Sequence, residues 1–206
     1  MMLNEIKRAF AENKLAILAS AAILVISLLL GFYLEEYLYS YLNPVVEKLS
    51  QQVQEGLISP TFHDIFLNNL KVICTMFVFG IVFCFSALIL AFNGFFIGYF
   101  VGSVQDFGTV LAYIIPHGIF ELPSCVLACA ASFVLFNFIY KFIRALLNDT
   151  DDSISCKLRS SYGKTDDKLK QAIILFVVSV ILMVIAGIVE AYLTAPIAQF
   201  VLSLLG

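Results

Sequence analysis

Charged side chains are scarce in this sequence, and their scarcity decides the class of protein. Only 13% of the 206 residues are Asp, Glu, Lys or Arg, whereas a soluble domain carries about 25%. Hydrophobic residues make up 61% of the chain and the mean hydropathy is +0.97, which is more apolar surface than one compact core can bury. A soluble domain is therefore excluded. The sequence predicts an all-α, multi-pass transmembrane helical bundle with the lipid bilayer as its solvent.

Histidine is nearly absent, and the short motifs of common hydrolases are missing. The two histidines are His63 and His117, and no His-Glu-x-x-His segment is present to bind zinc. His117 and Glu121 supply two metal ligands without an obvious third. No Gly-x-Ser-x-Gly segment is present to hold a nucleophilic serine. We therefore predict no catalytic residues, no metal site and no enzyme activity.

The cysteines lack the spacing of a metal site. Four lie inside apolar runs (Cys74, Cys84, Cys125, Cys129) and Cys156 lies in a polar loop. Small buried thiols are the expected interpretation of such a set, because isolated cysteines behave as small apolar residues. The net charge of −3 says little about partners. We predict no cofactor and no nucleic-acid partner.

What the chain does have is long apolar runs. A helix needs about 20 apolar residues to cross a bilayer. The sequence predicts five such spans and a single membrane domain over residues 1–206, with spans at about 15–34, 72–92, 94–115, 118–143 and 172–193. The stretch around residues 93–123 is broken by polar residues and prolines, so a re-entrant hairpin is the alternative there. Residues 197–205 are too short to cross.

Residues 35–71 form the longest predicted outer loop, with amphipathic helical character. Asn43 with Pro44 resembles a helix start, and Ser59 with Pro60 resembles a second one. Apolar residues recur at helical spacing between them. Helices lying along the membrane surface or packing as a cap on the spans both fit this pattern.

The basic residues predict the orientation. Three of the 12 Lys and Arg residues precede the first span, and seven crowd residues 141–170. The positive-inside rule therefore places the N-terminus and the basic loop 144–170 in the cytoplasm, and the C-terminus outside the cytoplasmic membrane. The polar stretch 149–167 is expected to be a flexible loop. Its basic part could touch anionic lipid, but the interspersed aspartates weaken that interpretation.

A few polar residues lie inside or between the apolar runs. Ionisable groups there are costly and are candidates for function. His117 and Glu121 share one helix face a turn apart, with Pro116 expected in the first helical turn and Pro123 expected to kink the helix. We predict an embedded polar cluster, structural or ion-binding, of Asn93, Asp106, His117, Glu121 and Glu190.

Small residues at four-residue spacing predict close helix packing. One set is Gly94, Gly98 and Gly102, and a second is Gly187, Ala191 and Ala195. We expect these two faces to pack on each other or on similar partners, which would bring Glu190 towards His117 and Glu121.

Four segments of the chain resemble the stage II sporulation protein M family. The most specific is PHGIFELP at 116–123, and the others are FLNNL at 66–70, AFNGFFIG at 91–98 and AGIVEAYLTAP at 186–196. Ser124 departs from the family pattern, which usually has alanine there. The resemblance implies a multi-pass membrane protein that, in endospore formers, scaffolds peptidoglycan-degrading partners. Relatives also occur in bacteria and archaea that do not form spores.

Two functions remain open at this point. The first is a scaffold or assembly factor for other membrane or envelope proteins, in which the polar cluster fixes the packing of the helices. The alternative is a transporter or channel component in which embedded carboxylates at a broken helix bind a cation. A homo-oligomer is compatible with either.

Overall fold

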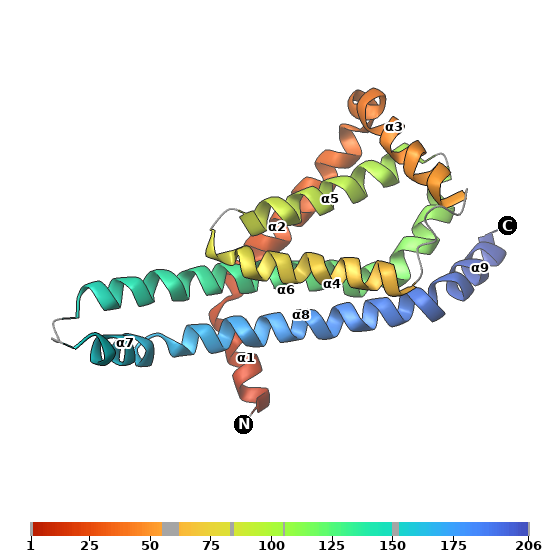
Figure 1. Ribbon diagram of the computed structural model, residues 1–206. Coiled ribbons are helices and arrows are strands. Elements are labelled where there is room, and N and C mark those ends of the chain that lie inside the picture. Colours follow the sequence, from red (N-terminus) through yellow and green to blue (C-terminus); the bar gives the residue numbers. More distant parts are fainter. Residues whose placement is uncertain (1, 55–61, 83–84, 105, 150–152, 206) are drawn as a thin grey trace.

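The fold is entirely helical in the residues that the structure describes. The computed structural model (Figure 1) describes residues 2–54, 62–82, 85–104, 106–149 and 153–205. The helices are α1 (Met2–Glu12), α2 (Lys14–Tyr33), α3 (Glu35–Gln54), α4 (Phe62–Val78), the short 3₁₀ turn η1 (Phe79–Ile81), α5 (Phe85–Ser103), α6 (Phe107–Leu147), α7 (Ile154–Gly163), α8 (Asp166–Tyr192) and α9 (Thr194–Leu205).

Four of these helices, α2, α5, α6 and α8, are long and apolar enough to cross a bilayer. Shorter apolar helices cover Phe66–Ile81 and Thr194–Leu204. The predicted class, an all-α multi-pass membrane bundle, is confirmed. The first and last predicted spans agree closely with α2 and α8, although α8 begins six residues before the predicted residue 172.

The predicted bounds of the middle spans are wrong. The range 72–92 runs over the end of α4, the turn η1 and the start of α5, and 94–115 runs over the end of α5 and the start of α6. In the described residues η1 ends at Ile81 and α5 begins at Phe85, while α5 ends at Ser103 and α6 begins at Phe107. Both breaks lie inside runs without Lys or Arg. Because those runs are apolar on both sides of each break, hydropathy alone did not locate them.

Helix α6 begins about ten residues before the predicted span 118–143. Asp106 is its N-cap, and its carboxylate accepts a hydrogen bond from the Thr109 backbone N–H at 3.1 Å. Pro116 therefore lies in the helix interior and not in the first turn, and Pro123 also lies within α6. Figure 1 shows the first turns of α6 descending from the end of α5, whereas the rest of α6 runs beside α8. Such a change of direction is typical of helices with internal prolines.

Two predicted loops are more helical than expected. Helix α3 begins at Glu35 and continues through Pro44, so the predicted start at Asn43 is wrong. The two carboxylates in its first turn, Glu35 and Glu36, favour a start there because they interact with the helix dipole. The predicted start at Ser59 and Pro60 lies outside the described residues. The stretch 149–167, predicted to be a flexible loop, contains α7.

Helices α2 and α5 form one closely packed pair. A side chain at Gly94 would meet Ser27 and the Leu24 carbonyl, and one at Gly98 would meet the Leu28 carbonyl. The partners advance along α2 as the glycines advance along α5, so the two helices run parallel. Backbones approach this closely only where side chains are absent. Helices α3 and α4 must therefore return the chain to the end of the bundle at which α2 began.

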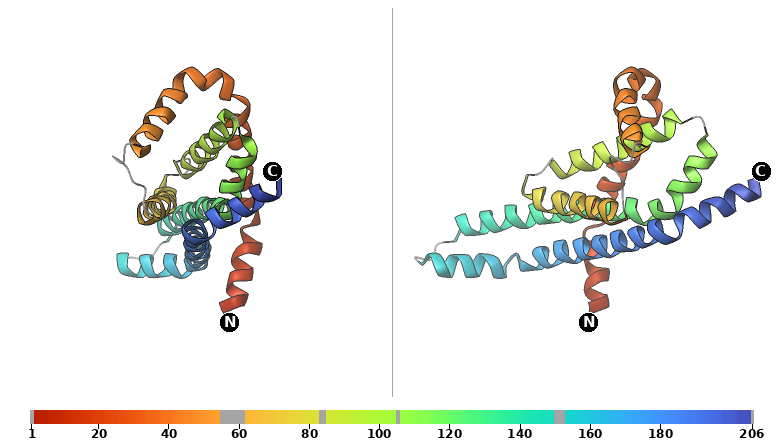
Figure 2. Two further views of the ribbon diagram at one scale, coloured as in Figure 1. Left: turned by 90° about the vertical axis from the view of Figure 1, so that its right-hand side faces the viewer. Right: turned by 45° about the vertical axis from the view of Figure 1, so that its right-hand side comes forward.

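Helices α6 and α8 form a second, antiparallel pair, which Figure 2 shows running side by side while α2 crosses it. The contact includes a reciprocal bridge between two buried serines. Ser124 Oγ donates to the Ser179 carbonyl at 2.8 Å, and Ser179 Oγ donates to the Ser124 carbonyl at 2.8 Å. Both hydroxyls are thereby satisfied without water, as a bilayer interior requires.

The segment of α6 after Pro123 is the centre of the bundle. Residues 124–132 are all buried, and their small side chains let α2, α4, α5 and α8 approach. The main core contains Cys125 and Cys129 of α6 together with Leu24, Ile73, Met76, Leu90 and Met183. The cysteines are reduced and buried there, and the described residues contain no three-residue group of metal ligands.

The serine bridge gives a modest expected effect. Ser124→Ala removes one hydrogen bond to the Ser179 carbonyl while leaving a residue that fits the same space. Interhelical hydrogen bonds in membranes contribute about 0.6 kcal/mol on average and up to about 1.7 kcal/mol. We expect a loss of roughly 1 kcal/mol, measured by unfolding in detergent. A loss of several kcal/mol would show that the bridge does more than join two helices.

Candidate functional site

Two residues of the predicted polar cluster, His117 and Glu121, lie together in the bent part of α6 before residue 124. His117 Nε2 lies 4.0 Å from Glu121 Oε2, one helical turn away, and both side chains are half-buried. Pro116 and Pro123 flank this pair. A proline cannot donate a backbone hydrogen bond to the fourth residue before it, so the carbonyls of Ala112 and Ile119 lose their intrahelical partners. The polar pair therefore lies where the helix is already irregular.

Helix α8 and helix α9 complete this group. Thr194 Oγ1, at the start of α9, lies 3.5 Å from His117 Nδ1 and 3.2 Å from the Val189 carbonyl. Glu190, on the last turns of α8, is close enough to Glu121 to interact with it electrostatically. The group at the junction of α6, α8 and α9, called the outer polar group below, therefore consists of His117, Glu121, Glu190 and Thr194. The sequence reading missed Thr194, although it lies within AGIVEAYLTAP, four residues after Glu190.

An apolar groove begins at this group. His117 and Glu121 line a cavity of about 360 Å³ together with Phe96, Ile97 and Phe100 of α5 and Ile114, Gly118 and Leu122 of α6. A second cavity of about 640 Å³ lies between α2, α5 and α6, and its walls are hydrophobic apart from Gly118 and the Tyr33 hydroxyl. The two cavities share Ile97, Ile114, Gly118 and Leu122. The bent part of α6 is thus incompletely packed against the α2–α5 pair.

Two predicted members of the cluster lie elsewhere. Asp106 is exposed and caps α6, so its inclusion is corrected. Asn93 donates its side-chain amide to the Ile89 carbonyl of its own helix at 2.8 Å. That bond is local and gives Asn93 no link to α6.

The two small-residue faces do not pack on each other, which corrects that part of the prediction. Gly94, Gly98 and Gly102 face α2 and the start of α3, and not α8. Gly187 is buried on α8, whereas Ala191 is exposed. Glu190 approaches Glu121 because α8 packs on α6, and the serine bridge is one of the contacts between these helices.

The outer polar group has no cation of its own nearby in the sequence. No Lys or Arg occurs in residues 72–140 or after residue 170. The ion pairs of the described residues are otherwise confined to residues 8–12 and 149–170. Two half-buried carboxylates, an imidazole and a hydroxyl can hydrogen-bond a donor or attract a positive charge. Buried polar groups of this kind require such partners.

Comparison with known proteins bears on the same residues. The model of the stage II sporulation protein M family matches residues 19–195. The chain belongs to this family. The match covers α2 to the start of α9 and includes all four residues of the outer polar group.

Two relatives come from the archaeon Methanocaldococcus jannaschii. The chain is 34% identical to the uncharacterised protein MJ0793 over 147 residues, which is 69% of this chain and 75% of the relative. It is 29% identical to the uncharacterised protein MJ0706 over 215 aligned positions, covering 98% of this chain and 91% of the relative. No solved structure matches the chain.

Two of the segments that resemble the family are distant in sequence but meet in the fold. PHGIFELP supplies His117 and Glu121, and AGIVEAYLTAP supplies Glu190 and Thr194. These segments are separated by 62 residues in sequence (186 − 123 − 1 = 62), yet they meet at the outer polar group.

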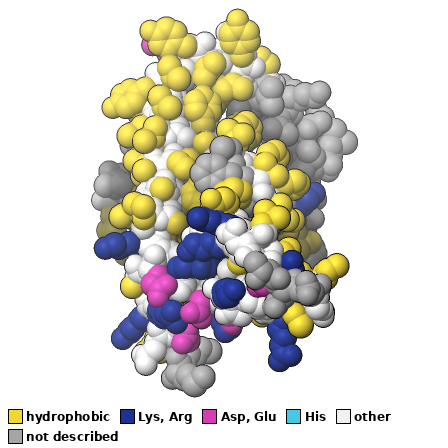
Figure 3. Space-filling view, turned by 90° about the vertical axis from the view of Figure 1, so that its left-hand side faces the viewer, with side chains coloured by type: hydrophobic (Ala, Val, Ile, Leu, Met, Phe, Trp, Pro, Cys, Tyr) yellow, Lys and Arg dark blue, Asp and Glu magenta, His cyan; other side chains and the backbone are white. Residues whose placement is uncertain are grey.

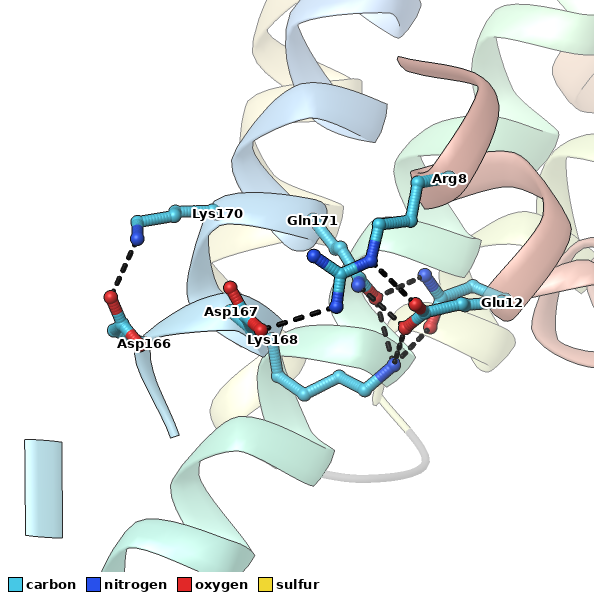
Figure 4. Close-up of polar contacts among 8 residues, drawn as sticks. Arg8, Glu12, Asp166, Asp167, Lys168, Lys170 and Gln171 are labelled. Carbon is cyan, nitrogen blue, oxygen red and sulfur yellow. Dashed lines mark hydrogen bonds and ion pairs between the residues drawn. The ribbon is translucent and has the colours of Figure 1, made fainter. Parts of the chain in front are cut away.

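A second polar group, at the amino-terminal end of the bundle, was not predicted. Arg8 donates to Glu12 at 2.7 Å and to Asp167 at 3.2 Å, and Lys168 donates to Glu12 at 3.2 Å (Figure 4). The buried side chains of Asn13 and Gln171 are hydrogen-bonded to each other at 2.8 Å. This amino-terminal network ties α1 to the start of α8. No local sequence signal reveals it, because its partners are more than 150 residues apart.

Proposed function

We propose that this member of the stage II sporulation protein M family is a scaffold or assembly factor that binds other membrane or envelope proteins through its transmembrane helices. The observation that carries the proposal is the groove between the α2–α5 pair and the bent part of α6, which begins at the outer polar group. Its apolar walls fit a partner helix. Its carboxylates fit a hydrogen-bond donor or a basic side chain on that helix. No catalytic reaction is proposed.

The rigidity of the rest of the bundle supports this role. Glycines fix α2 against α5, and the serine bridge fixes α6 against α8. The two pairs therefore present closely packed walls, and the bent part of α6 between them is incompletely packed. A partner helix placed there would bury apolar surface and satisfy Glu121 and Glu190 at the same time.

We propose the cytoplasmic membrane as the location, with the N-terminus and α7 inside. The excess of Lys and Arg at these two places supports that orientation. Because α2 and α5 run parallel, α4 with η1 would provide the outward-to-inward crossing between them. The C-terminal helix α9 and the outer polar group would then lie towards the outer surface.

The test compares Glu121→Gln with wild type in a mild-detergent purification of the tagged full-length protein from its native membrane. Glutamine keeps the size of the side chain but removes its charge. Losing one side of a desolvated charge pair costs several kcal/mol, so we expect the amount of specific partner to fall roughly ten-fold or more. Quantitative mass spectrometry of the purified complexes measures the change.

Glu5→Gln is the matched control, because Glu5 is an exposed carboxylate on α1 far along the chain from the groove. It should leave partner recovery unchanged. Equal recovery of partners with wild type and Glu121→Gln, at matched protein levels, would refute a role for the outer polar group in binding.

The transporter alternative predicts a different outcome of the same experiment. It would be favoured if only the chain itself were recovered as a stable homo-oligomer, and ion flux in liposomes would then be measured. The transporter alternative would use the carboxylates of Asp106, Glu121 and Glu190. Asp106 instead caps α6 and does not join the other two.

A further inference from the structure

The hairpin formed by the end of α6 and by α7 projects beyond the membrane-spanning part of the bundle. The part of α6 after Pro123, residues 124–147, is roughly 36 Å long at 1.5 Å per residue, which already exceeds the roughly 30 Å of the hydrocarbon layer. Figure 1 shows its last turns extending past α1 and α2, with α7 beside them. This projecting part is called the α7 arm below and comprises residues 140–149 and 153–165.

Large apolar side chains are exposed along the α7 arm. On α7 itself, Ile154, Leu158 and Tyr162 recur every four residues and are exposed, Ile154 to 75%. On α6, Leu147 is 79% exposed, and Tyr140 and Ile143 are exposed on the same helix. The α6 side chains line a hollow of about 420 Å³ together with Arg144 and Asn148. Outside the bilayer such side chains require a partner.

Among the residues of the α7 arm that the structure describes, five are Lys or Arg and one, Asp149, is acidic. Asp151 and Asp152 lie outside the described residues. The sequence from Ser153 to Thr165 contains no Asp or Glu, and it contains Lys157, Arg159 and Lys164. Figure 3 shows Lys and Arg side chains, with Asp and Glu side chains among them, in the lower half of the face that looks along the arm, and hydrophobic side chains over the upper half.

The aspartates next to these cations that the structure describes are already paired. Asp149 pairs with Lys164 at 3.7 Å, Asp166 with Lys170 at 2.6 Å, and Asp167 with Arg8 at 3.2 Å. Among the described residues, four cations of the arm make no ion pair: Lys141, Arg144, Lys157 and Arg159. The described aspartates therefore do not neutralise these four cations.

We propose that the α7 arm binds the surface of the membrane in which the protein is embedded, through anionic lipid head groups. Exposed apolar side chains interleaved with Lys and Arg on a short helix are the combination that lies at a bilayer interface. The apolar side chains enter the head-group region, and the cations meet the lipid phosphates. The bilayer is within reach, because the arm continues directly into the apolar parts of α6 and α8.

The test places an environment-sensitive fluorophore on Ser155→Cys, on the exposed side of α7, in a Cys156→Ser background. The full-length protein is reconstituted in nanodiscs of neutral phosphatidylcholine or of phosphatidylcholine with phosphatidylglycerol. We expect a blue-shifted emission, and quenching by head-group-labelled lipid, in the anionic discs alone. High salt should reverse both changes. The same chain without Ser155→Cys measures the background from other cysteines.

Charge variants test whether the cations of the α7 arm, and not the overall positive charge of the protein, hold the arm on the lipid. Each cation near an anionic surface contributes about five-fold to binding, so Lys157→Gln with Arg159→Gln should reduce the ratio of bound to free arm on the order of 30-fold. Lys7→Gln with Lys14→Gln removes two exposed cations outside the arm and should have no effect.

Two results would overturn the proposal. Emission that is identical in neutral and anionic discs would show that lipid charge does not hold the arm. Emission that changes with protein density in the disc, and not with lipid composition, would show that the apolar face binds a second copy of the chain. Neither result bears on partner binding at the outer polar group.

Discussion

Gly98→Ala is expected to destabilise the protein by about 1–3 kcal/mol, although the same change at Gly118 should be neutral or slightly stabilising. A Cβ at Gly98 would collide with the Leu28 carbonyl on α2, and the backbone there cannot move without moving the helix. At Gly118 the nearest atom to a new Cβ is Ile114 Cγ2 at 3.7 Å, which is ordinary contact. Alanine otherwise favours a helix by roughly 0.5–1 kcal/mol over glycine.

The bundle contains its own reporter for this measurement. Cys125 and Cys129 are buried in the core shared by five helices, α2, α4, α5, α6 and α8. A thiol-reactive dye in detergent therefore reports the temperature at which the core opens, once the other three cysteines, Cys74, Cys84 and Cys156, have been replaced by serine. Gly163→Ala is a further control, since no atom lies within 4 Å of a Cβ at Gly163.

A double variant tests whether the effect belongs to the α2–α5 contact. A Cβ at Gly31 of α2 would collide with the Phe95 carbonyl of α5, so Gly31→Ala should be as harmful as Gly98→Ala. Once either change has separated the helices, the second should cost less, giving a total below the sum of the two. Strict additivity, or an unchanged unfolding temperature for Gly98→Ala, would contradict the parallel packing of α2 and α5.

The class of fold and the first and last spans could be predicted from the sequence, because they depend on composition and length. The glycine stripe of α5 was also correctly identified as a packing face. The helix that packs on this stripe was not predicted correctly. Both α8, with Gly187, and α2, with Ser20, Ser27 and Gly31, have small residues that could face it, and residue spacing alone does not distinguish between them. Only the arrangement of the helices chooses between them.

The breaks within the long apolar region illustrate a different limit. Asp106 was assigned to an embedded cluster because it lies between apolar runs. The same residue is an N-cap whose carboxylate accepts from the Thr109 N–H. A capping signal was therefore present at residue 106, and the cost of placing a free carboxylate in lipid favours the cap over the cluster.

The outer polar group was partly predictable for a physical reason. His117 and Glu121 are one turn apart on any helix, so their proximity is local. The approach of Glu190 and Thr194 depends on the antiparallel contact of α6 with α8. That contact rests on small buried residues such as Ser124 and Ser179, which carry little sequence signal. Ser124, which departs from the family pattern, is therefore a structural residue here.

The amino-terminal network predicts how acid will affect the protein. Glu12 accepts hydrogen bonds from Arg8, Gln171 and Lys168, in that order of effect, and they lower its pKa from 4.5 to about 2. A carboxyl group with a lower pKa in the folded state stabilises the fold above its unfolded pKa. Its contribution is fully present above about pH 5 and is lost as the pH falls from 4.5 towards 2.

The measurement compares the thermal unfolding of wild type and Glu12→Gln by circular dichroism across this pH range. The variant should be the less stable protein at pH 7, because glutamine cannot accept from Arg8 and Lys168 as a charged group. The difference in unfolding temperature should shrink steadily below pH 4.5 and vanish near pH 2. Glu5→Gln, an exposed carboxylate of the same helix, should match wild type throughout. A Glu12→Gln difference that persisted unchanged at pH 2 would mean that packing of the side chain, and not its charge, holds α1 on α8.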